Sequence, residues 1–576
     1  MMPRLRDLFL LLFFTLGGLA GCTSSPPAPP AVRIRWAADP QTLDPLLAST
    51  PQALEIINLL HCSLLFANAE TRQYVPWLAE TLPQIRHRGD SLTLYTYQLR
   101  PEATWDNGRP VLARDVAFTL KVLNCPGLPT EYARTQYGFV TDVELDTRDP
   151  RRFTLVCRGT APDLLAATGD YAVLPEYALD PQGQLRAVPL PLLQTDTAAA
   201  VQRYPVLRAF ARRYRRAHLN RYPERLPGCG PYSFAAWESG RLLRLRRKPR
   251  WWADTLPAPP TWLQARAPRL DYRIIPDDAT ALLALRRGDV DLYPMPPARE
   301  FNRLRRSADT VQLAFYAADS YEMTMIGFNT QRPALRDAPT RQALSLLFDV
   351  PGLMQATQAG LAYRSVSLIT PRDTLAYNRE LRLLPFDPAA AARQLARAGW
   401  QRQPDGTWQR PDAGQLALRI SYRAGEFEHE AVALQFRAAA GQVGIPVRLL
   451  PTEAGLLQQQ LVAGEIELYV RTLRGNPFSY NFTPILHSRA VGISNFTRYQ
   501  SATADRLMDS INVASGLRRQ QLVQRLQRQL RADAPLTVLY FTRYRLLARK
   551  ALRGVRALRV RPGYDVLRLE PAPPRS

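Results

Sequence analysis

Five histidines are the residues best suited to proton transfer or metal binding, and they are scattered along the chain at positions 61, 87, 218, 429 and 487. None is spaced to share a metal with another. The chain also has no HExxH, GxSxG or P-loop motif. Glu428-His429-Glu430 fits an exposed helix start better than a catalytic site. The sequence therefore predicts no enzyme, no cofactor and no metal site, and an exported hydrolase is kept only as a lesser alternative.

One cysteine near the N-terminus has a motif that supports specific chemistry. Arg4 and Arg6 precede an apolar run over 8–20, which ends in Leu19-Ala20-Gly21-Cys22. This order of charge, apolar core and small residues is typical of a secretory signal, and the run is shorter than the roughly 20 residues of a membrane-spanning helix. The final box resembles a bacterial lipobox, which predicts cleavage after 1–21 and lipidation of Cys22. The alternative is an ordinary signal with an incidental cysteine.

A Pro/Ser-rich tether is predicted to follow the lipidated cysteine over 22–31, because TSSPPAPP cannot pack into a core. We therefore expect an extracytoplasmic protein, anchored by lipid to a bacterial membrane on its periplasmic face or at the cell surface. Thr23 stands where some Gram-negative lipoproteins carry an Asp that retains them at the inner membrane, which leaves outer-membrane placement and a Gram-positive-style surface both open.

The remaining cysteines are Cys62, Cys125, Cys157 and Cys229. None is in CxxC spacing, so neither a zinc site nor a redox motif is indicated. Export would permit three disulfide connectivities, and free buried thiols are equally compatible with the sequence.

The formal net charge of +25 would suit a nucleic-acid partner. The basic residues are nearly all arginine, however, and they are dispersed along the chain. In the densest stretch, 208–225, apolar residues recur at helical spacing and most arginines lie elsewhere, as on a helix with a solvated face. We therefore expect no nucleic-acid partner.

Strands and helices alternate along the chain, which indicates mixed α/β domains. Sequence patterns predict strands over 32–36, 91–99, 152–157, 270–275, 322–328, 416–422 and 536–541 and a hairpin over 232–247. Periodic apolar stripes predict helices over 113–123, 279–287, 426–443, 454–462 and 515–531.

A colinear series of short motifs resembles the family 5 extracellular solute-binding proteins, the dipeptide- and oligopeptide-binding group that serves ABC importers. The series covers nearly the whole chain after the tether. Its members are 43–45 (LDP), 76–80 (PWLAE), 95–100 (YTYQLR), 104–108 (TWDNG), 115–119 (DVAFT), 228–232 (GCGPY) with Trp237, Gly240 and 251–252 (WW), Leu285 with Gly288 and Asp291, 328–329 (FN), 341–344 (RQAL) with Asp349, 387–388 (DP) with 398–400 (AGW), and 444–445 (GI). The family usually has Thr where this chain has Cys229.

The resemblance implies a two-lobed periplasmic-binding-protein-like α/β fold (type II, cluster C) with an extra subdomain in the first lobe. Lobe I is expected to comprise 32–50, 165–320 and 500–576, with the extra subdomain at 51–164. Lobe II is expected at 321–499. The lobes would close around a ligand, and the closed monomer would dock on the permease subunits of an ABC importer.

The ligand depends on the segment 469–480 (YVRTLRGNPFSY). Peptide-binding members carry an Asp here that pairs with the ligand's α-ammonium, and alignment on Asn476-Pro477 places Leu473 at that position. Losing the carboxylate removes a charge-assisted hydrogen bond worth roughly 1.5–3 kcal/mol. Arg471 and Arg474 would instead favour a carboxylate or phosphate. The alternative is that both arginines are merely solvated.

Eight residues are predicted to bind the ligand: Thr42, Leu43, Phe328, Asn329, Arg471, Leu473, Arg474 and Asn476. The resulting hypothesis is a lipid-anchored protein that captures a peptide or similar small polar solute and delivers it to an importer. A ligand sensor or scaffold without transport is the main alternative, because the resemblance does not separate the two.

Overall fold

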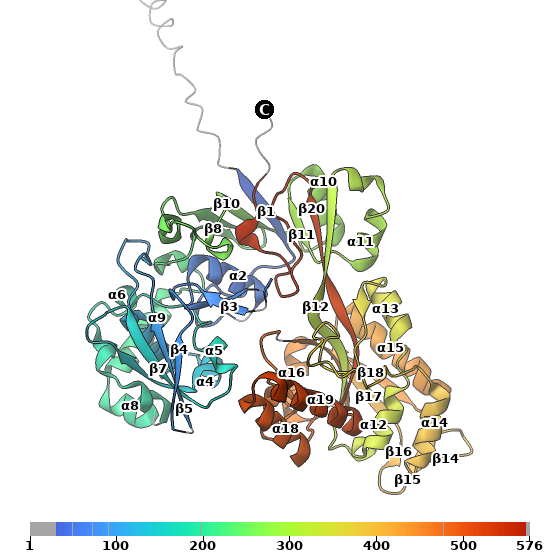
Figure 1. Ribbon diagram of the computed structural model, residues 1–576. Helices are drawn as coiled ribbons and strands as arrows, with labels where there is room; N and C mark the ends of the chain where they lie inside the picture. Colours follow the sequence, from blue (N-terminus) through green and yellow to red (C-terminus); the bar gives the residue numbers. More distant parts are fainter. Residues whose placement is uncertain are drawn as a thin grey trace, which may run out of the picture.

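The computed structural model describes residues 30–48, 50–68, 70–71, 73–89, 91–195, 197–475 and 477–571. Cys22 and Asn476 lie outside these ranges. The chain forms two lobes connected by long strands (Figure 1). None of the helices formed by the described residues is both long and apolar enough to cross a membrane.

One sheet of eleven strands runs through both lobes. Its order is β18-β17-β19-β12-β20-β11-β1-β10-β9-β8, and β13 pairs with β20. The strands are β1 (Ala31–Trp36), β8 (Tyr232–Glu238), β9 (Leu242–Arg247), β10 (Arg269–Ile274), β11 (Leu292–Pro294), β12 (Leu313–Phe328), β13 (Ala362–Tyr363), β17 (Leu418–Arg423), β18 (Val447–Thr452), β19 (Leu468–Arg474) and β20 (Leu536–Arg549).

The strands β12 and β20 join the lobes. They pair with each other antiparallel along most of their length, with a register shift between Asp319 and Met323. Beyond this shift, β12 pairs with β19 in lobe II, whereas the far end of β20 pairs with β11 in lobe I. Two adjacent strands that each cross from one lobe to the other are a suitable hinge. The sequence patterns predicted only part of each strand.

Lobe I is built around the parallel pair of β1 and β10. Val32, Ile34 and Leu270 are fully buried in its core. The helix α2 (Pro51–Leu60) crosses this core and begins with a Thr50 side chain that accepts from the Ala53 amide. The helices α10 (Asp278–Arg287) and α11 (Ala298–Leu304) form a second core beside β11.

An additional four-stranded sheet, in the order β4-β5-β7-β6, forms the outer part of lobe I. Its helical layer continues to α9, where Phe210 packs edge-on against Phe118 of α3, so the layer extends beyond the predicted limit at residue 164. The elements are β2 (Leu65–Asn68), β3 (Gln73–Pro76), β4 (Gln84–Arg88), β5 (Leu92–Gln98), β6 (Val140–Leu145), β7 (Arg152–Arg158), α3 (Ala113–Leu123), α4 (Glu131–Tyr137), α5 (Leu164–Ala167), α6 (Glu176–Leu179), α7 (Leu190–Thr195), α8 (Thr197–Arg203) and α9 (Val206–Ala217).

Lobe II surrounds the β17–β19 end of the main sheet. Its elements are α12 (Ala338–Ser345), α13 (Val350–Gln358), α14 (Pro388–Arg397), α15 (Phe427–Gln442), α16 (Ala454–Ala463), α17 (Thr483–Leu486), α18 (Ala502–Val513), α19 (Gly516–Asp533) and the small strands β14 (Gln401–Arg402), β15 (Trp408–Arg410) and β16 (Gly414–Gln415). The domain division drawn from the sequence assigned 500–576 to lobe I. In the structure, α18 and α19 pack with Met323, Leu368 and Leu486 in lobe II, and the chain returns to lobe I along β20.

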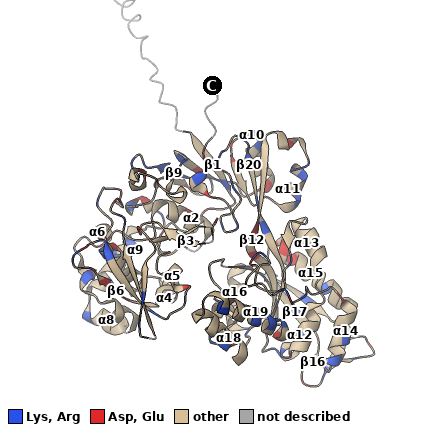
Figure 2. Ribbon diagram, viewed as in Figure 1, with Lys and Arg blue, Asp and Glu red and all other residues tan. Residues whose placement is uncertain are grey.

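Basic side chains are spread over both lobes rather than gathered on one element (Figure 2). Many are neutralised locally, as Arg33 is by Asp291 at 2.9 Å and Arg244 by Asp271 at 2.8 Å. This distribution matches the dispersed charge of the sequence.

Candidate ligand-binding cavity between the lobes

A cavity of about 480 Å³ lies between the lobes and is lined by residues of both. This volume is within the range of about 300–1,000 Å³ that small-molecule sites have. Lobe I contributes residues of α2 and β2, Trp77, Trp262 and side chains of the C-terminal segment 556–568, whereas lobe II contributes Tyr321, Glu322, Arg474, Gly475, Pro477 and Phe478. The cavity is therefore enclosed only when both lobes are in place.

The wall formed by lobe I is apolar and firmly packed. Trp77 is 2% exposed, and its ring lies 4.7 Å from that of Phe66. Trp262 donates from its indole nitrogen to the Pro76 carbonyl at 3.2 Å. These aromatic rings belong to the lobe I core, so this wall exists independently of lobe II.

A buried carboxyl, Glu55 on α2, lines the same wall. Tyr564 donates to it at 2.9 Å and Tyr272 at 3.0 Å. Burial raises the pKa of Glu55 to about 8, although both tyrosine hydrogen bonds lower it. Glu55 is therefore mostly protonated at neutral pH and adds no charge to the cavity.

The wall formed by lobe II is polar and lies at the ends of two paired strands. Glu322 of β12 is in register with Arg474 of β19, and the Gly475 amide donates to the Tyr321 carbonyl at 2.7 Å. Arg561, from the C-terminal segment, binds both carboxylate oxygens of Glu322. Arg474 lies 3.6 Å from the same carboxylate. Two guanidiniums, Arg474 from lobe II and Arg561 from lobe I, therefore share the one carboxylate of Glu322.

A second group of contacts links the two lobes directly. Asp163, just before α5 in lobe I, binds Arg519 of α19 through both oxygens, at 2.6 and 2.5 Å. Ser479 of lobe II donates to the same carboxylate at 2.5 Å. We call Asp163, Arg519 and Ser479 the interlobe clasp. Its ion pair is largely shielded, with side chains 18% and 11% exposed, so it links the lobes more effectively than a surface pair would.

Aromatic rings support the interlobe clasp. Tyr74 of β3 and Phe478 of lobe II lie 5.0 Å apart, and the Arg519 guanidinium stacks 5.3 Å from the Tyr480 ring. Both the ion pair and the ring contact join segments from different lobes. The two lobes therefore contact each other directly in this structure.

Of the predicted ligand-binding residues that the structure describes, Arg474 lines the cavity. Arg471 lies on the opposite face of β19, where its guanidinium is 4.8 Å from the Phe496 ring. Leu473 shares that face and packs against the cores of α16 and α18–α19. Alternation along a strand explains the division, since successive side chains point to opposite faces.

The other predicted residues lie in the framework of the two lobes. Leu43 and Phe328 are fully buried in the lobe I and lobe II cores. Asn329 donates to the carbonyls of Gly464 and Ile466, at 3.1 and 2.9 Å. The Thr42 hydroxyl accepts from the Asp44 amide at 3.1 Å.

Several cavity residues were not predicted as ligand contacts. Trp77 stands out in the sequence only as part of the family motif over 76–80. Glu55 has no feature that separates it from other helix residues. Asp170 and Arg561 lie in loops without a recognisable motif. Only the fold brings them to one cavity, so no spacing in the sequence could have indicated them.

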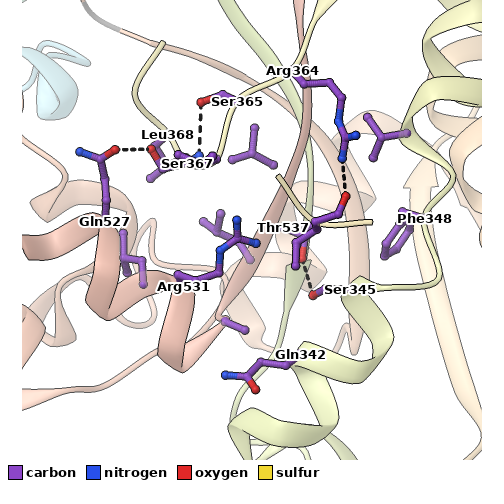
Figure 3. Close-up of a pocket in the computed structure, with 17 residues that line it drawn as sticks. Gln342, Ser345, Phe348, Arg364, Ser365, Ser367, Leu368, Gln527, Arg531 and Thr537 are labelled. Atoms are coloured by element: carbon purple, nitrogen blue, oxygen red, sulfur yellow. Dashed lines mark hydrogen bonds between the residues drawn. The ribbon is translucent and has the colours of Figure 1, made fainter. Parts of the chain in front are cut away.

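A second hollow lies inside lobe II, between α12, α19, β20 and the segment 364–368 (Figure 3). Its volume is about 60 Å³, room for a few water molecules but not for a peptide. Polar groups there bind one another: Ser367 donates to Gln527 at 2.8 Å, and Ser345 and Thr537 are 2.6 Å apart. This hollow is a minor packing defect rather than a ligand site.

The four described cysteines are free and buried. Burial raises the pKa of the Cys125 and Cys157 thiols to about 12. No group of His, Cys, Asp and Glu within the described ranges is arranged to hold a metal ion.

Two lobes on hinge strands, with a cavity lined by both, define the class of two-lobed solute-binding proteins. The family model "Bacterial extracellular solute-binding proteins, family 5 Middle" matches residues 73–490, most of the chain. The chain therefore belongs to the family 5 extracellular solute-binding proteins, as its motifs predicted.

Curated relatives carry peptide-binding names. "Probable di/tripeptide-binding protein 5" of Pseudomonas aeruginosa is 27% identical over 291 residues, which cover 50% of this chain and 51% of the relative. "Oligopeptide-binding protein AppA" of Bacillus subtilis is 23% identical over 362 residues, covering 59% and 61%. The matched part of the chain thus spans about half to three-fifths of these relatives.

Solved structures share the fold over almost the whole chain. AppA from Bacillus subtilis in complex with a nonapeptide superposes with a TM-score of 0.71 at 19% identity, covering 95% of this chain and all of that one (100%). NikZ from Campylobacter jejuni in complex with Ni(L-His) gives 0.70 at 18%, covering 94% and 99%. One fold therefore holds both a peptide and a metal complex, so the ligand of this chain has to be argued from its own cavity.

Proposed function

We propose that this protein captures a peptide or a similar small polar solute between its lobes and delivers it to the permease of an ABC importer. The observation that carries the proposal is the 480 Å³ cavity, which has an apolar wall from lobe I and a charged wall from lobe II. Curated relatives named for di-, tri- and oligopeptide binding support the ligand class.

The cavity suits a ligand that combines apolar side chains with charged groups. The rings of Phe66, Trp77 and Trp262 can hold apolar side chains, and Arg474 offers guanidinium donors to an anionic group. Of the eight residues predicted from the sequence, we keep Arg474 as a direct ligand contact. Asn476, two residues further on, stays a prediction.

We also propose that the protein is held at a bacterial membrane by lipid on Cys22 and works outside the cytoplasm. The motif over 19–22 supports this proposal, and the tether would let the lobes close freely. Detergent phase separation tests the anchor: the wild type should enter the detergent phase, whereas Cys22→Ser should stay in the aqueous phase. Equal partitioning of both would contradict lipidation.

Isothermal titration against a panel of di- to pentapeptides tests ligand capture. We expect at least one peptide to bind with a dissociation constant in the micromolar range or below. Phe478→Ala should weaken binding, because its ring lies on the cavity wall. Phe427→Ala is the matched control, since that ring is 62% exposed on α15. Flat heats for every peptide would contradict the proposal, and turnover of a peptide would revive the hydrolase.

A ligand sensor without transport would bind the same peptides. Growth of the source bacterium on a bound peptide as sole nitrogen source separates the two functions. Loss of growth on deleting the gene supports import, whereas normal growth and normal peptide uptake favour a sensor or scaffold.

A further inference from the structure

The chain enters lobe I at one particular end of the main sheet. Ala31 begins β1, which runs parallel to β11. The strand β11 is antiparallel to β20, and Arg549 at the end of β20 lies opposite Leu313, the first residue of β12. The segment that leads back to Cys22 therefore joins lobe I at the end of the sheet where β12 begins and β20 ends (Figure 1).

The length of that segment limits how far this end of lobe I can lie from a membrane. Residues 22–30 span at most about 30 Å when fully extended. The strand β12 alone has 16 residues, so it extends about 50 Å from this end into lobe II. The lipid on Cys22 that we propose above would thus keep this end of lobe I, rather than lobe II, next to the bilayer.

Five basic side chains from three chain connections gather at this end of lobe I. They end α10, follow α11 and follow β20, and they are Arg287, Arg305, Arg306, Lys550 and Arg553. All five are exposed, and none forms an ion pair or a side-chain hydrogen bond with another described residue. The Arg286–Asp309 ion pair, at 2.7 Å, and the Lys550 amide, which donates to the Gln312 carbonyl at 2.9 Å, tie the three connections together. We call the five residues the basic end of lobe I.

The carboxylates near the basic end are mostly neutralised within the protein. Asp309 accepts from Arg286 through both oxygens, at 2.7 and 2.8 Å. Asp291 binds Arg33 at 2.9 Å. Asp289 is exposed and forms no ion pair with a described residue. Five unpaired cations against one unpaired carboxylate leave this end of the molecule positively charged.

An apolar side chain is exposed among these cations. Val311 lies in the connection between α11 and β12 and is 75% exposed. In bulk water such a side chain gains nothing from its basic neighbours. At a membrane surface it can enter the headgroup region while guanidinium and ammonium groups bind lipid phosphates. The combination therefore suits an anionic bilayer.

We infer that the basic end of lobe I binds the anionic headgroups of the bilayer to which the protein is anchored. The inference rests on the lipid anchor of the proposed function and adds a second, reversible contact to it. Because β12 and β20 lead away from this end, lobe II then projects from the bilayer and is free to move on the hinge. The helix α9 is also rich in arginine, but it belongs to the outer layer of lobe I rather than to the end where the tether joins.

Binding to vesicles tests this contact without the lipid. The mature chain from residue 22, carrying Cys22→Ser, is mixed with vesicles of phosphatidylcholine, either alone or with one-third phosphatidylglycerol. We expect it to co-sediment with the phosphatidylglycerol vesicles and not with pure phosphatidylcholine. High salt should release it, because exposed charges are screened.

Two double variants test whether the basic end is responsible. Since each basic residue near an anionic surface contributes about fivefold to partitioning, Arg305→Gln with Arg306→Gln should weaken vesicle binding by roughly 10- to 30-fold. Arg212→Gln with Arg216→Gln is the matched control, because it removes the same charge from exposed positions on α9. It should cost less than about threefold, since those charges are more than a Debye length from the bilayer. Thermal unfolding of both variants checks that each is folded.

A fluorescent label tests the orientation directly. Val311→Cys carries an environment-sensitive dye, and its emission should shift to the blue when phosphatidylglycerol vesicles are added. Ile493→Cys is the matched control, because Ile493 is 69% exposed but lies in lobe II, and its dye should not respond. The four described native cysteines are buried, so labelling of the folded protein is confined to the introduced thiol.

Three results would overturn the inference. They are no binding to phosphatidylglycerol vesicles, equal losses in the two double variants, or a dye response at Ile493 as large as that at Val311. None of them bears on the lipid anchor, because the chain in these experiments carries no lipid. Equal detergent partitioning of the wild type and Cys22→Ser would instead contradict the anchor itself.

Discussion

The two walls of the interlobe cavity are built in different ways. The lobe I wall is part of a hydrophobic core: Trp77 is 2% exposed, and Glu55 is held by two tyrosines. The lobe II wall consists of strand ends and the loop that carries Phe478, with charged side chains open to the cavity. Lobe I therefore provides a preformed apolar surface for the ligand. Lobe II provides charged side chains that reach the ligand when the two lobes come together.

Removing one aromatic ring from each wall tests this comparison most strongly. Trp77→Ala should destabilise the protein by about 3–5 kcal/mol, because it leaves a hole in the lobe I core. Phe478→Ala should cost about 1 kcal/mol or less in stability and act instead on peptide affinity, by roughly fivefold. Urea unfolding and titration calorimetry measure the two effects. Similar losses of unfolding free energy in both variants would contradict the difference between the two walls.

Glu55 should make the stability of the lobe I wall depend on pH. Its pKa is raised from the ordinary 4.5 to about 8, so the fold favours the protonated form. The free energy of unfolding should therefore fall between about pH 5 and pH 8, by on the order of 2–4 kcal/mol from this group.

Glu55→Gln removes the titration and should flatten this decrease, so that the variant is more stable than the wild type at pH 8.5. Chemical unfolding at several pH values measures it. Parallel curves for the two proteins would show that Glu55 is not held in its neutral form.

The interlobe clasp is expected to affect closure rather than folding. Arg519→Met removes the ion pair with Asp163 but keeps much of the side-chain volume. Peptide affinity should fall about tenfold, because the closed form loses a charge-assisted contact. The radius of gyration in small-angle scattering should increase.

Arg518→Met is the matched control for the clasp, since Arg518 lies exposed on the same helix. It should leave both affinity and radius unchanged. Equal effects of the two substitutions would mean that the loss of a positive charge on α19, not the clasp, is responsible.

The smallest effect is expected at the cysteines, which lie in the cores of lobe I and do not belong to either lining surface. Because burial raises the pKa of Cys125 and Cys157 to about 12, these thiols should react with Ellman's reagent only after unfolding. Rapid reaction in the native protein would indicate local opening of the lobe I cores.

Much of the fold could be predicted because local patterns and tertiary structure agree. The helix predicted over 113–123 matches α3, and the strand over 32–36 matches β1 to within a residue. The length of β12 and β20 was missed, since their outer halves have no simple alternation and are fixed by pairing with each other.

The site was less predictable for a related reason. Family motifs point to residues that hold the framework, such as Asn329, whereas the residues lining the cavity come from loops and strand ends that only the fold brings together. Arg474, which lines the cavity, was reached from the sequence only through its place three residues before Pro477, and its contact with a ligand stays a prediction. Asp170 carried no such signal.

The continuous sheet has a consequence for how the molecule loses its structure. The sheet extends from the edge of one lobe to the edge of the other, and its strands β12 and β20 belong to both. If either lobe unfolded, the hydrogen bonds between β12 and β20 would be lost there. The other lobe depends on the same two strands. We therefore expect the lobes to unfold together, in one cooperative heat-absorption peak, even though they move separately when they open and close.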